Sequence, residues 1–251
     1  MIGEFFFTIL HQPMYNVLIF FYDLFPFGGL GLAIILLTTL IKALTFPLTY
    51  KSMQSQKQMQ EIQPKINEIK EKYKDDKEKL AMEMMSVYKN NKVNPLASCL
   101  PLILQLIIFI VLYRVLVTGL GEVHTDWLYP FITNPGTLTA WFLGIDLTKV
   151  SVILAVLMAV AQHFQAKHMV SSRPPAAART SGALDEDMMA SMNKMMIYFL
   201  PAIILVAGVT TLPAGLSLYI LVSIIITFIM QEWFIKRTIR WPWQKELPPT
   251  N

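Results

Sequence analysis

A lysine, Lys42, lies inside a run of residues that is otherwise uncharged and mostly apolar. An ammonium group at the depth of a bilayer costs about 2.5–3.5 kcal/mol on insertion scales, so a residue of this kind usually serves a function. Helical spacing places three threonines on the face that carries the lysine: Thr38, Thr45 and Thr49. A cation on a polar helix face can attract an anionic group into a hydrated path.

Polar side chains also recur in the other apolar segments. Tyr219, Ser223 and Thr227 follow one another at every fourth residue, Gln105 precedes Phe109 by one turn, and Gln162 lies in a further segment. Because polar groups in a bilayer must face one another or water, we interpret these stripes as the wall of one hydrated cavity. We expect these segments to contain no carboxylate, and hence none that could pair with Lys42.

The same residues can be accounted for without a cavity. Gln and Thr can form hydrogen bonds between tightly packed membrane helices, which for Gln105 alone is the favoured interpretation. Each threonine can bond to its own helix. The lysine can extend its side chain to the membrane surface.

The composition indicates a polytopic membrane protein with one charged excursion. Of 251 residues, 54% are hydrophobic and 15% are charged, and ten of the 21 lysines and arginines lie between Lys51 and Lys92.

The net charge of +4 does not indicate nucleic acid, and we expect no sequence-specific nucleic-acid binding. With one cysteine and no His/Cys cluster, we expect no metal, no cofactor and no catalytic residue, hence no enzyme. No cleavable signal is evident in a start that lacks Lys and Arg.

The expected fold is an all-α polytopic membrane protein with five transmembrane helices, a cytoplasmic helical hairpin and an N-terminal interfacial helix. Residues 1–27 form the interfacial helix, because the part after Pro13 is shorter than the roughly 20 residues that span a bilayer. The five-span core comprises 28–50 and 94–237. Its spans are expected at about 29–50, 95–118, 150–169, 194–211 and 214–236, and a short basic tail follows at 238–251.

Residues 51–93 carry two amphipathic stripes near the helical period, which predicts a hairpin with a turn near Asp75. Pro64 is expected to end or kink its first arm. Asn94 should cap a helix that begins at Pro95. If the hairpin is cytoplasmic, nearly every Lys and Arg lies on that side, so the positive-inside rule sets the N-terminus outside and the C-terminus in the cytoplasm.

Three stretches together resemble the YidC family of membrane protein insertases, which has relatives in mitochondria and chloroplasts. They are "GLGLAIILLTTLIKALTFPLTYKSMQSQKQMQEIQPKINEIKEKY", "VNPLASCLPLILQL" and "MIYFLP…LPAGLSLYILVS". The resemblance runs in order from about Phe5 to Arg237. It implies five spans, a cytoplasmic hairpin, and a hydrophilic groove open to cytoplasm and lipid but closed on the outer side.

The resemblance implies groove positions at Thr38, Gln105, Phe109 and Tyr219, and a basic residue at the position of Lys42. The family usually has arginine there, so the charge is kept but the two-pronged guanidinium is not. Ile220 is a second departure, because an aromatic residue commonly follows the tyrosine.

The implied function is a membrane protein insertase and chaperone of the bacterial cytoplasmic membrane, acting with or without the Sec translocon. Its expected partners are nascent membrane proteins, the lipid bilayer, the Sec translocon and the ribosome. The tail after Arg237 is short, so ribosome contact is expected through the hairpin, the 167–194 loop and the tail. A channel or transporter for small anions is the alternative, although no internal repeat is evident. A helix-bundle scaffold, in which Lys42 would be replaceable, is a third.

Overall fold

The protein is helical throughout most of the part that its structure, a computed structural model, describes: residues 7–25, 29–119, 124–171 and 194–236. The sequence prediction of an all-helical architecture is confirmed at this level. The elements are η1 (a π-helix, Phe7–His11), α2 (Gln12–Leu24), α3 (Gly29–Lys72), α4 (Lys77–Asn90), α5 (Pro95–Gly119), η3 (a 3₁₀ turn, Thr125–Trp127), β1 (Trp141–Phe142), β2 (Ile145–Asp146), α6 (Val152–Ser171), η4 (a π-helix, Met195–Phe199), α8 (Leu200–Thr210) and α9 (Ala214–Lys236). The interior of the predicted 167–194 loop and the tail at 238–251 lie outside the described residues.

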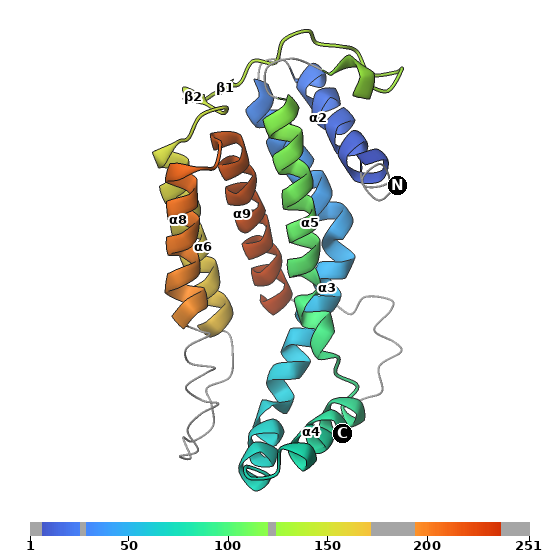
Figure 1. The fold of residues 1–251 in the computed structure, drawn as a ribbon, viewed down its shortest axis with the longest axis vertical. Helices are drawn as coiled ribbons and strands as arrows, with labels where there is room; N and C mark the ends of the chain where they lie inside the picture. Colours follow the sequence, from blue (N-terminus) through green and yellow to red (C-terminus); the bar gives the residue numbers. More distant parts are fainter. Residues whose placement is uncertain (1–6, 26–28, 120–123, 172–193, 237–251) are drawn as a thin grey trace.

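The helices form a bundle in which α3 contacts α2, α5 and α9. Helices α6 and α8 pack against each other, and α6 also packs against α9 (Figure 1). The segment 124–150, with its small antiparallel β1–β2 ribbon, covers one end of the bundle (Figure 1). At the opposite end α3 extends beyond the other helices and leads to α4 (Figure 1). We call these two ends the loop end and the hairpin end.

One uninterrupted helix, α3, contains both the predicted first span and the predicted first arm of the hairpin. It has 44 residues and includes Pro47 and Pro64. Pro64 therefore does not end the arm, because the helix continues to Lys72. The chain then turns at 73–75, and Asp76 caps α4 by accepting a hydrogen bond from the Lys79 backbone N–H at 3.1 Å.

A small apolar cluster holds α4 against α3. Ile62 and Ile66 of α3 are buried with Val93, and Met84, Val87 and Tyr88 of α4 pack on them. This cluster is separate from the core of the bundle, which contains Tyr15, Ile34, Leu112 and Leu216. The hairpin end therefore has independent packing.

Hydrogen bonds fasten the covering loop to α2. The Asn16 side chain donates to the Trp127 carbonyl at 2.8 Å and accepts from the Tyr129 N–H at 2.7 Å. The Tyr15 hydroxyl accepts from the His124 N–H at 2.9 Å. Helix α2 thus serves as an anchor for the loop.

Two histidines pack on Trp127 in this cap. His124 stacks on the indole at 4.1 Å, and His11 meets it edge-on at 5.1 Å between ring centroids. Burial lowers the pKa of His11 from its ordinary 6.5, and the nearby positive groups Arg114 and His124 lower it further. His11 is therefore held neutral more strongly than a free histidine.

The loop also closes over the starts of α3 and α9. The Phe142 ring lies directly on Gly31, where a Cβ would overlap it. The backbone N–H groups of Ala214 and Gly215 donate to the carbonyls of Lys149 and Leu147 at 2.7 and 2.9 Å. These bonds satisfy the first donors of α9, so the loop end is sealed by both side chains and backbone.

Two helical segments of the described chain are long and apolar enough to cross a membrane: Gly29–Met59 and Ala214–Phe234. Shorter apolar helical stretches run from Ile103 to Val117 and from Met195 to Thr210. The predicted number of five spans stays a prediction.

Candidate functional site

Lys42 is at the centre of a polar network that joins three helices. Its ammonium group donates to the Gln105 side-chain oxygen of α5 at 3.1 Å and to the Thr227 hydroxyl of α9 at 2.9 Å. Thirteen residues separate Lys42 from the start of α3, which places it about 20 Å along the helix at 1.5 Å per residue. Three residues that the sequence had placed in different segments thus meet at one level of the bundle.

Gln105 links Lys42 to the part of α9 that lies nearer the loop end. Its amide nitrogen donates to the Tyr219 hydroxyl at 2.6 Å, and its oxygen also accepts from the Ser223 hydroxyl at 3.4 Å. Thr227 in turn donates to the Ser223 carbonyl at 2.7 Å. Every polar group of the network therefore has a partner, and all the acceptors around the ammonium are neutral.

The threonines of α3 bond to their own helix. Thr38, Thr45 and Thr49 each donate to the carbonyl four residues earlier, at 2.6, 2.8 and 3.0 Å. Thr38 is 1% exposed and belongs to the packed part of the bundle, whereas Thr45 and Thr49 are half-buried. Their hydroxyls thus make the local bond that a membrane threonine can form without any cavity.

The two other predicted residues lie outside the network. Phe109 is half-buried and packs on the edge of the main core. Gln162 is half-buried on α6, and the described part of the chain shows no hydrogen bond between it and Lys42, Gln105 or Thr227. The structure brings together five of the ten predicted residues: Lys42, Gln105, Tyr219, Ser223 and Thr227.

Burial changes sharply at the level of the network. Within α3 the buried side chains of the bundle end at Thr38, and the next buried residue is Tyr50. Within α5 the buried side chains among those described lie between Val111 and Leu116. Within α9 they lie between Ala214 and Ile224. The three helices thus bury their side chains toward the loop end, and α3 buries none of its side chains between Thr38 and Tyr50, the interval that contains Lys42.

Aromatic contacts between α3 and α9, which the sequence did not reveal, lie on the hairpin side of the network. The ring of Phe46 meets Trp233 at 5.8 Å, and Tyr50 meets Phe234 at 5.2 Å between centroids. These contacts fix the two helices beside each other below Lys42. The half-buried level of Lys42 therefore lies between these aromatic contacts and the core.

The expectation that the spans contain no carboxylate is wrong. Glu232 lies within α9, and its carboxylate contacts the His168 ring nitrogen Nε2 of α6. Within the described residues, Lys42 forms no ion pair. The carboxylate belongs to the α6–α9 contact, so the charge of Lys42 remains uncompensated by the described part of the protein.

Comparison with known proteins gives a consistent result. Residues 20–242 match the family described as 60Kd inner membrane protein. A protein named "Membrane protein insertase YidC" from Pelobacter propionicus is 35% identical over 236 residues, which are 93% of this chain and 39% of that protein. Proteins of the same name from Syntrophobacter fumaroxidans and Geobacter sulfurreducens are 36% and 31% identical over 90% and 93% of this chain, and 38% of each of those proteins is covered.

The chain spans about two-fifths of the length of these relatives. The match nevertheless extends from residue 20 to residue 242, so it includes α3 to α9, the hairpin and the covering loop. The family is one of bacterial inner-membrane proteins, which agrees with the two long apolar helices. The chain therefore belongs to the 60Kd inner membrane protein family, the family of the YidC insertases.

Proposed function

We propose that the chain inserts other proteins into the bacterial cytoplasmic membrane through a groove bounded by α3, α5 and α9. The observation that carries the proposal is the change in burial near Lys42, where buried side chains of α3, α5 and α9 give way to half-buried and exposed ones. A groove that is closed at the loop end and open toward the hairpin end would let water reach a half-buried ammonium. The relatives' name supports the same activity.

The proposed mechanism uses no covalent step. Carrying a polar tail through dry lipid costs several kcal/mol for each charge, and a hydrated path part of the way reduces the dry distance. The ammonium of Lys42 has two neutral acceptors, so a carboxylate of a substrate can approach as its first ionic partner. The apolar segment of the substrate then leaves sideways into lipid, because that is its favourable environment.

The residues proposed for this groove are those predicted from the sequence, and each has its own role. Lys42 supplies the charge, and Gln105 and Thr227 hold it in position. Tyr219 and Ser223 support Gln105 from α9. Thr45, Thr49, Phe109 and Gln162 are proposed as wall residues, whereas Thr38 is part of the packed floor.

The proposed orientation places the hairpin end in the cytoplasm and the loop end outside, with five spans. Ten lysines lie between Lys51 and Lys92, while the described loop end has Arg114 and Lys149, and Lys149 is paired with Asp146 at 3.2 Å. This asymmetry agrees with the positive-inside rule. In a Cys99→Ser background, a cysteine at position 130 should react with an impermeant thiol reagent from outside, and one at position 75 should not. The opposite pattern would invert the orientation.

The hairpin is the proposed receiver of substrates and the proposed contact for the ribosome, and cooperation with the Sec translocon belongs to the same proposal. Met82 and Met85 of α4 are 68% and 67% exposed and offer an adaptable apolar surface beside the lysines. Deleting residues 55–90 should impair insertion while leaving the bundle folded, since the hairpin has separate packing.

The activity is tested by complementation. Cells depleted of their own insertase should regain insertion of small one-span and two-span proteins when this chain is expressed. The contrary result is a chain that reaches the membrane without restoring insertion and conducts small anions in reconstituted vesicles. That result would refute the insertase proposal and favour the alternative of an anion channel.

A further inference from the structure

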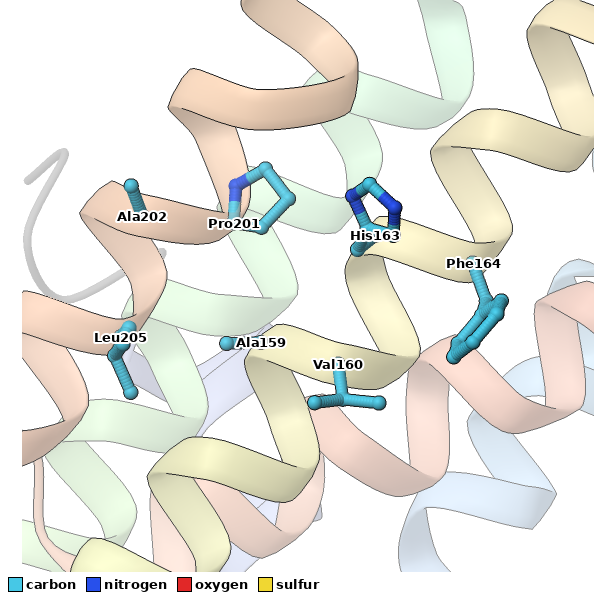
Figure 2. A pocket seen from close by; sticks show the side chains of 7 residues that line it. All are labelled: Ala159, Val160, His163, Phe164, Pro201, Ala202 and Leu205. Carbon is cyan, nitrogen blue, oxygen red and sulfur yellow. The ribbon is translucent and has the colours of Figure 1, made fainter.

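A shallow apolar hollow lies between α6 and α8, on the side of α6 away from the polar network. It has a volume of about 280 Å³ and is lined by side chains of both helices (Figure 2). Ala159 and Pro201 are buried at its base, while Val160 and Phe164 at its rim are 47% and 62% exposed. The hollow is therefore open to whatever surrounds the bundle, and in a membrane that is lipid.

The hollow exists because small residues occupy this level of a close helix pair. Nearer the loop end, a Cβ on Gly208 would lie 2.7 Å from the Ala155 Cβ, so the helices touch there. Farther along, Ala159 and Ala202 leave space that larger side chains would fill (Figure 2). The hollow follows α6 for the six residues from Ala159 to Phe164, a rise of about 8 Å at 1.5 Å per residue.

One hydrogen bond fixes the register of the two walls toward the hairpin end. The His163 Nδ1–H donates to the Ile197 carbonyl of η4 at 2.8 Å, and the two rings of His163 and Tyr198 lie 5.7 Å apart. Helix α6 runs toward the hairpin end, and the helix formed by η4 and α8 runs back from it (Figure 1). Residues just after His163 therefore lie beside residues just before Ile197.

Two exposed lysines occupy those positions. Lys167 follows His163 by one turn of α6, and Lys194 precedes η4 directly. They lie about 6 Å beyond His163 and about 10 Å before Pro201 along their helices. Neither forms an ion pair with a described residue. The surface thus presents an apolar trough with two positive charges at one end that no described residue compensates.

We propose that this trough binds one phospholipid with an anionic headgroup, with an acyl chain in the hollow and the phosphate between Lys167 and Lys194. Basic side chains at the polar end of a gap between membrane helices suit such headgroups. The length of about 8 Å suits a segment of one acyl chain, whereas a docked helix would contact several turns. The charge at one end and the apolar lining at the other match the polarity of a single lipid.

The test uses the full chain in nanodiscs of phosphatidylcholine with a minority of phosphatidylglycerol that has the same acyl chains. Lipids that stay bound after transfer to detergent are counted by native mass spectrometry. Each lysine near an anionic headgroup contributes about fivefold, so with two lysines phosphatidylglycerol should be retained about 25-fold over phosphatidylcholine. Lys167→Gln should reduce the preference to about fivefold, and Lys167→Gln with Lys194→Gln should abolish it.

Two further variants separate the parts of the proposal. Lys149→Gln, at the opposite end of α6, changes an exposed lysine and should leave the preference unchanged. Val160→Trp fills the hollow and should reduce retention of both lipids while the lysines stay in place. Equal retention of the two lipids by the unaltered chain, or an unchanged preference in the double lysine variant, would overturn the proposal. Disulfide cross-linking between two copies carrying Val160→Cys, at a yield that phosphatidylglycerol does not reduce, would assign the trough to a second copy instead.

Discussion

Replacing Lys42 by alanine is the most direct test of the proposed groove. The ammonium has two neutral acceptors, Gln105 and Thr227, and a carboxylate at about 4 Å would gain about 4 kcal/mol at an effective dielectric constant of 20. Roughly half of that is offset by partial desolvation of the carboxylate, which leaves about 2 kcal/mol, or about thirtyfold. Insertion of a substrate with an acidic tail should therefore slow by about thirtyfold.

Matched substrates and variants isolate the charge. A one-span substrate whose tail carries aspartates is compared with the same substrate carrying asparagines, and protease protection of the translocated tail measures the rate. Lys42→Ala should slow the neutral tail by less than about threefold, because no charge interaction is lost. Lys42→Arg should retain both activities, and Lys42→Glu should be the slowest with the acidic tail.

The fold should survive these changes. When Lys42 is removed, Gln105 keeps its bond to Tyr219 and Thr227 keeps its bond to a backbone carbonyl, so no buried polar group loses its last partner. The thermal midpoint of Lys42→Met, which retains the apolar stem, should equal or exceed that of the original chain. If Lys42→Ala inserts acidic tails at the original rate, the lysine merely extends to the membrane surface and the electrostatic mechanism is wrong.

Three further predictions concern the hairpin, the α6–α8 contact and the cap. Ile66→Asp places a charge in a site that is 3% exposed, so trypsin should cleave the hairpin faster while the bundle keeps its thermal midpoint; unchanged cleavage would refute separate packing. Gly208→Ala should lower the stability by about 1–3 kcal/mol in thermal unfolding, and adding Ala155→Gly should restore it. Burial and two neighbouring positive groups lower the pKa of His11, so the unfolded chain binds more protons and stability falls as the pH drops below 6.5. The protection factors of the α2 amides in hydrogen exchange should accordingly fall between pH 7 and pH 5, and they should fall less in His11→Gln.

The helices could be predicted because the uncharged runs and the charged block differ strongly in composition. The start of α5 at Pro95 also follows from a local rule, since a proline at the first helical position loses no hydrogen bond. The continuity of α3 could not be predicted in this way. Pro64 weakens a helix locally, but Ile62 and Ile66 on either side of it are buried against α4, and that packing lies outside the local sequence.

The loop end was not foreseen for a different reason. Its main hydrogen bonds join Asn16 to Trp127 and Tyr129, which lie more than a hundred positions after Asn16 in the sequence. Spacing within one element says nothing about contacts at this separation. In the structure Trp127 is the packing centre of a cap, in contact with His11, Tyr15 and His124.

The polar stripes were informative for the network and less so for its surroundings. Four-residue spacing placed Tyr219, Ser223 and Thr227 on one face of α9, and a lysine in an apolar run required acceptors. The same spacing on α3 identified three threonines whose hydroxyls bond to their own helix. Periodicity determines which helix face a residue occupies. A threonine on that face can still donate its hydroxyl hydrogen bond to its own helix, so its presence does not require a cavity.

The location of Glu232 decides what the network can attract. A carboxylate beside Lys42 would have given a neutral pair, with little reason for a substrate to approach. Instead, Glu232 contacts His168 on the α6 side of α9, and Lys42 contacts neutral groups on α5 and α9. The site therefore keeps a net positive charge at a half-buried level, where a charge interacts more strongly than in bulk water. A selectivity for acidic over neutral segments follows from that separation of the two charges on opposite sides of one helix.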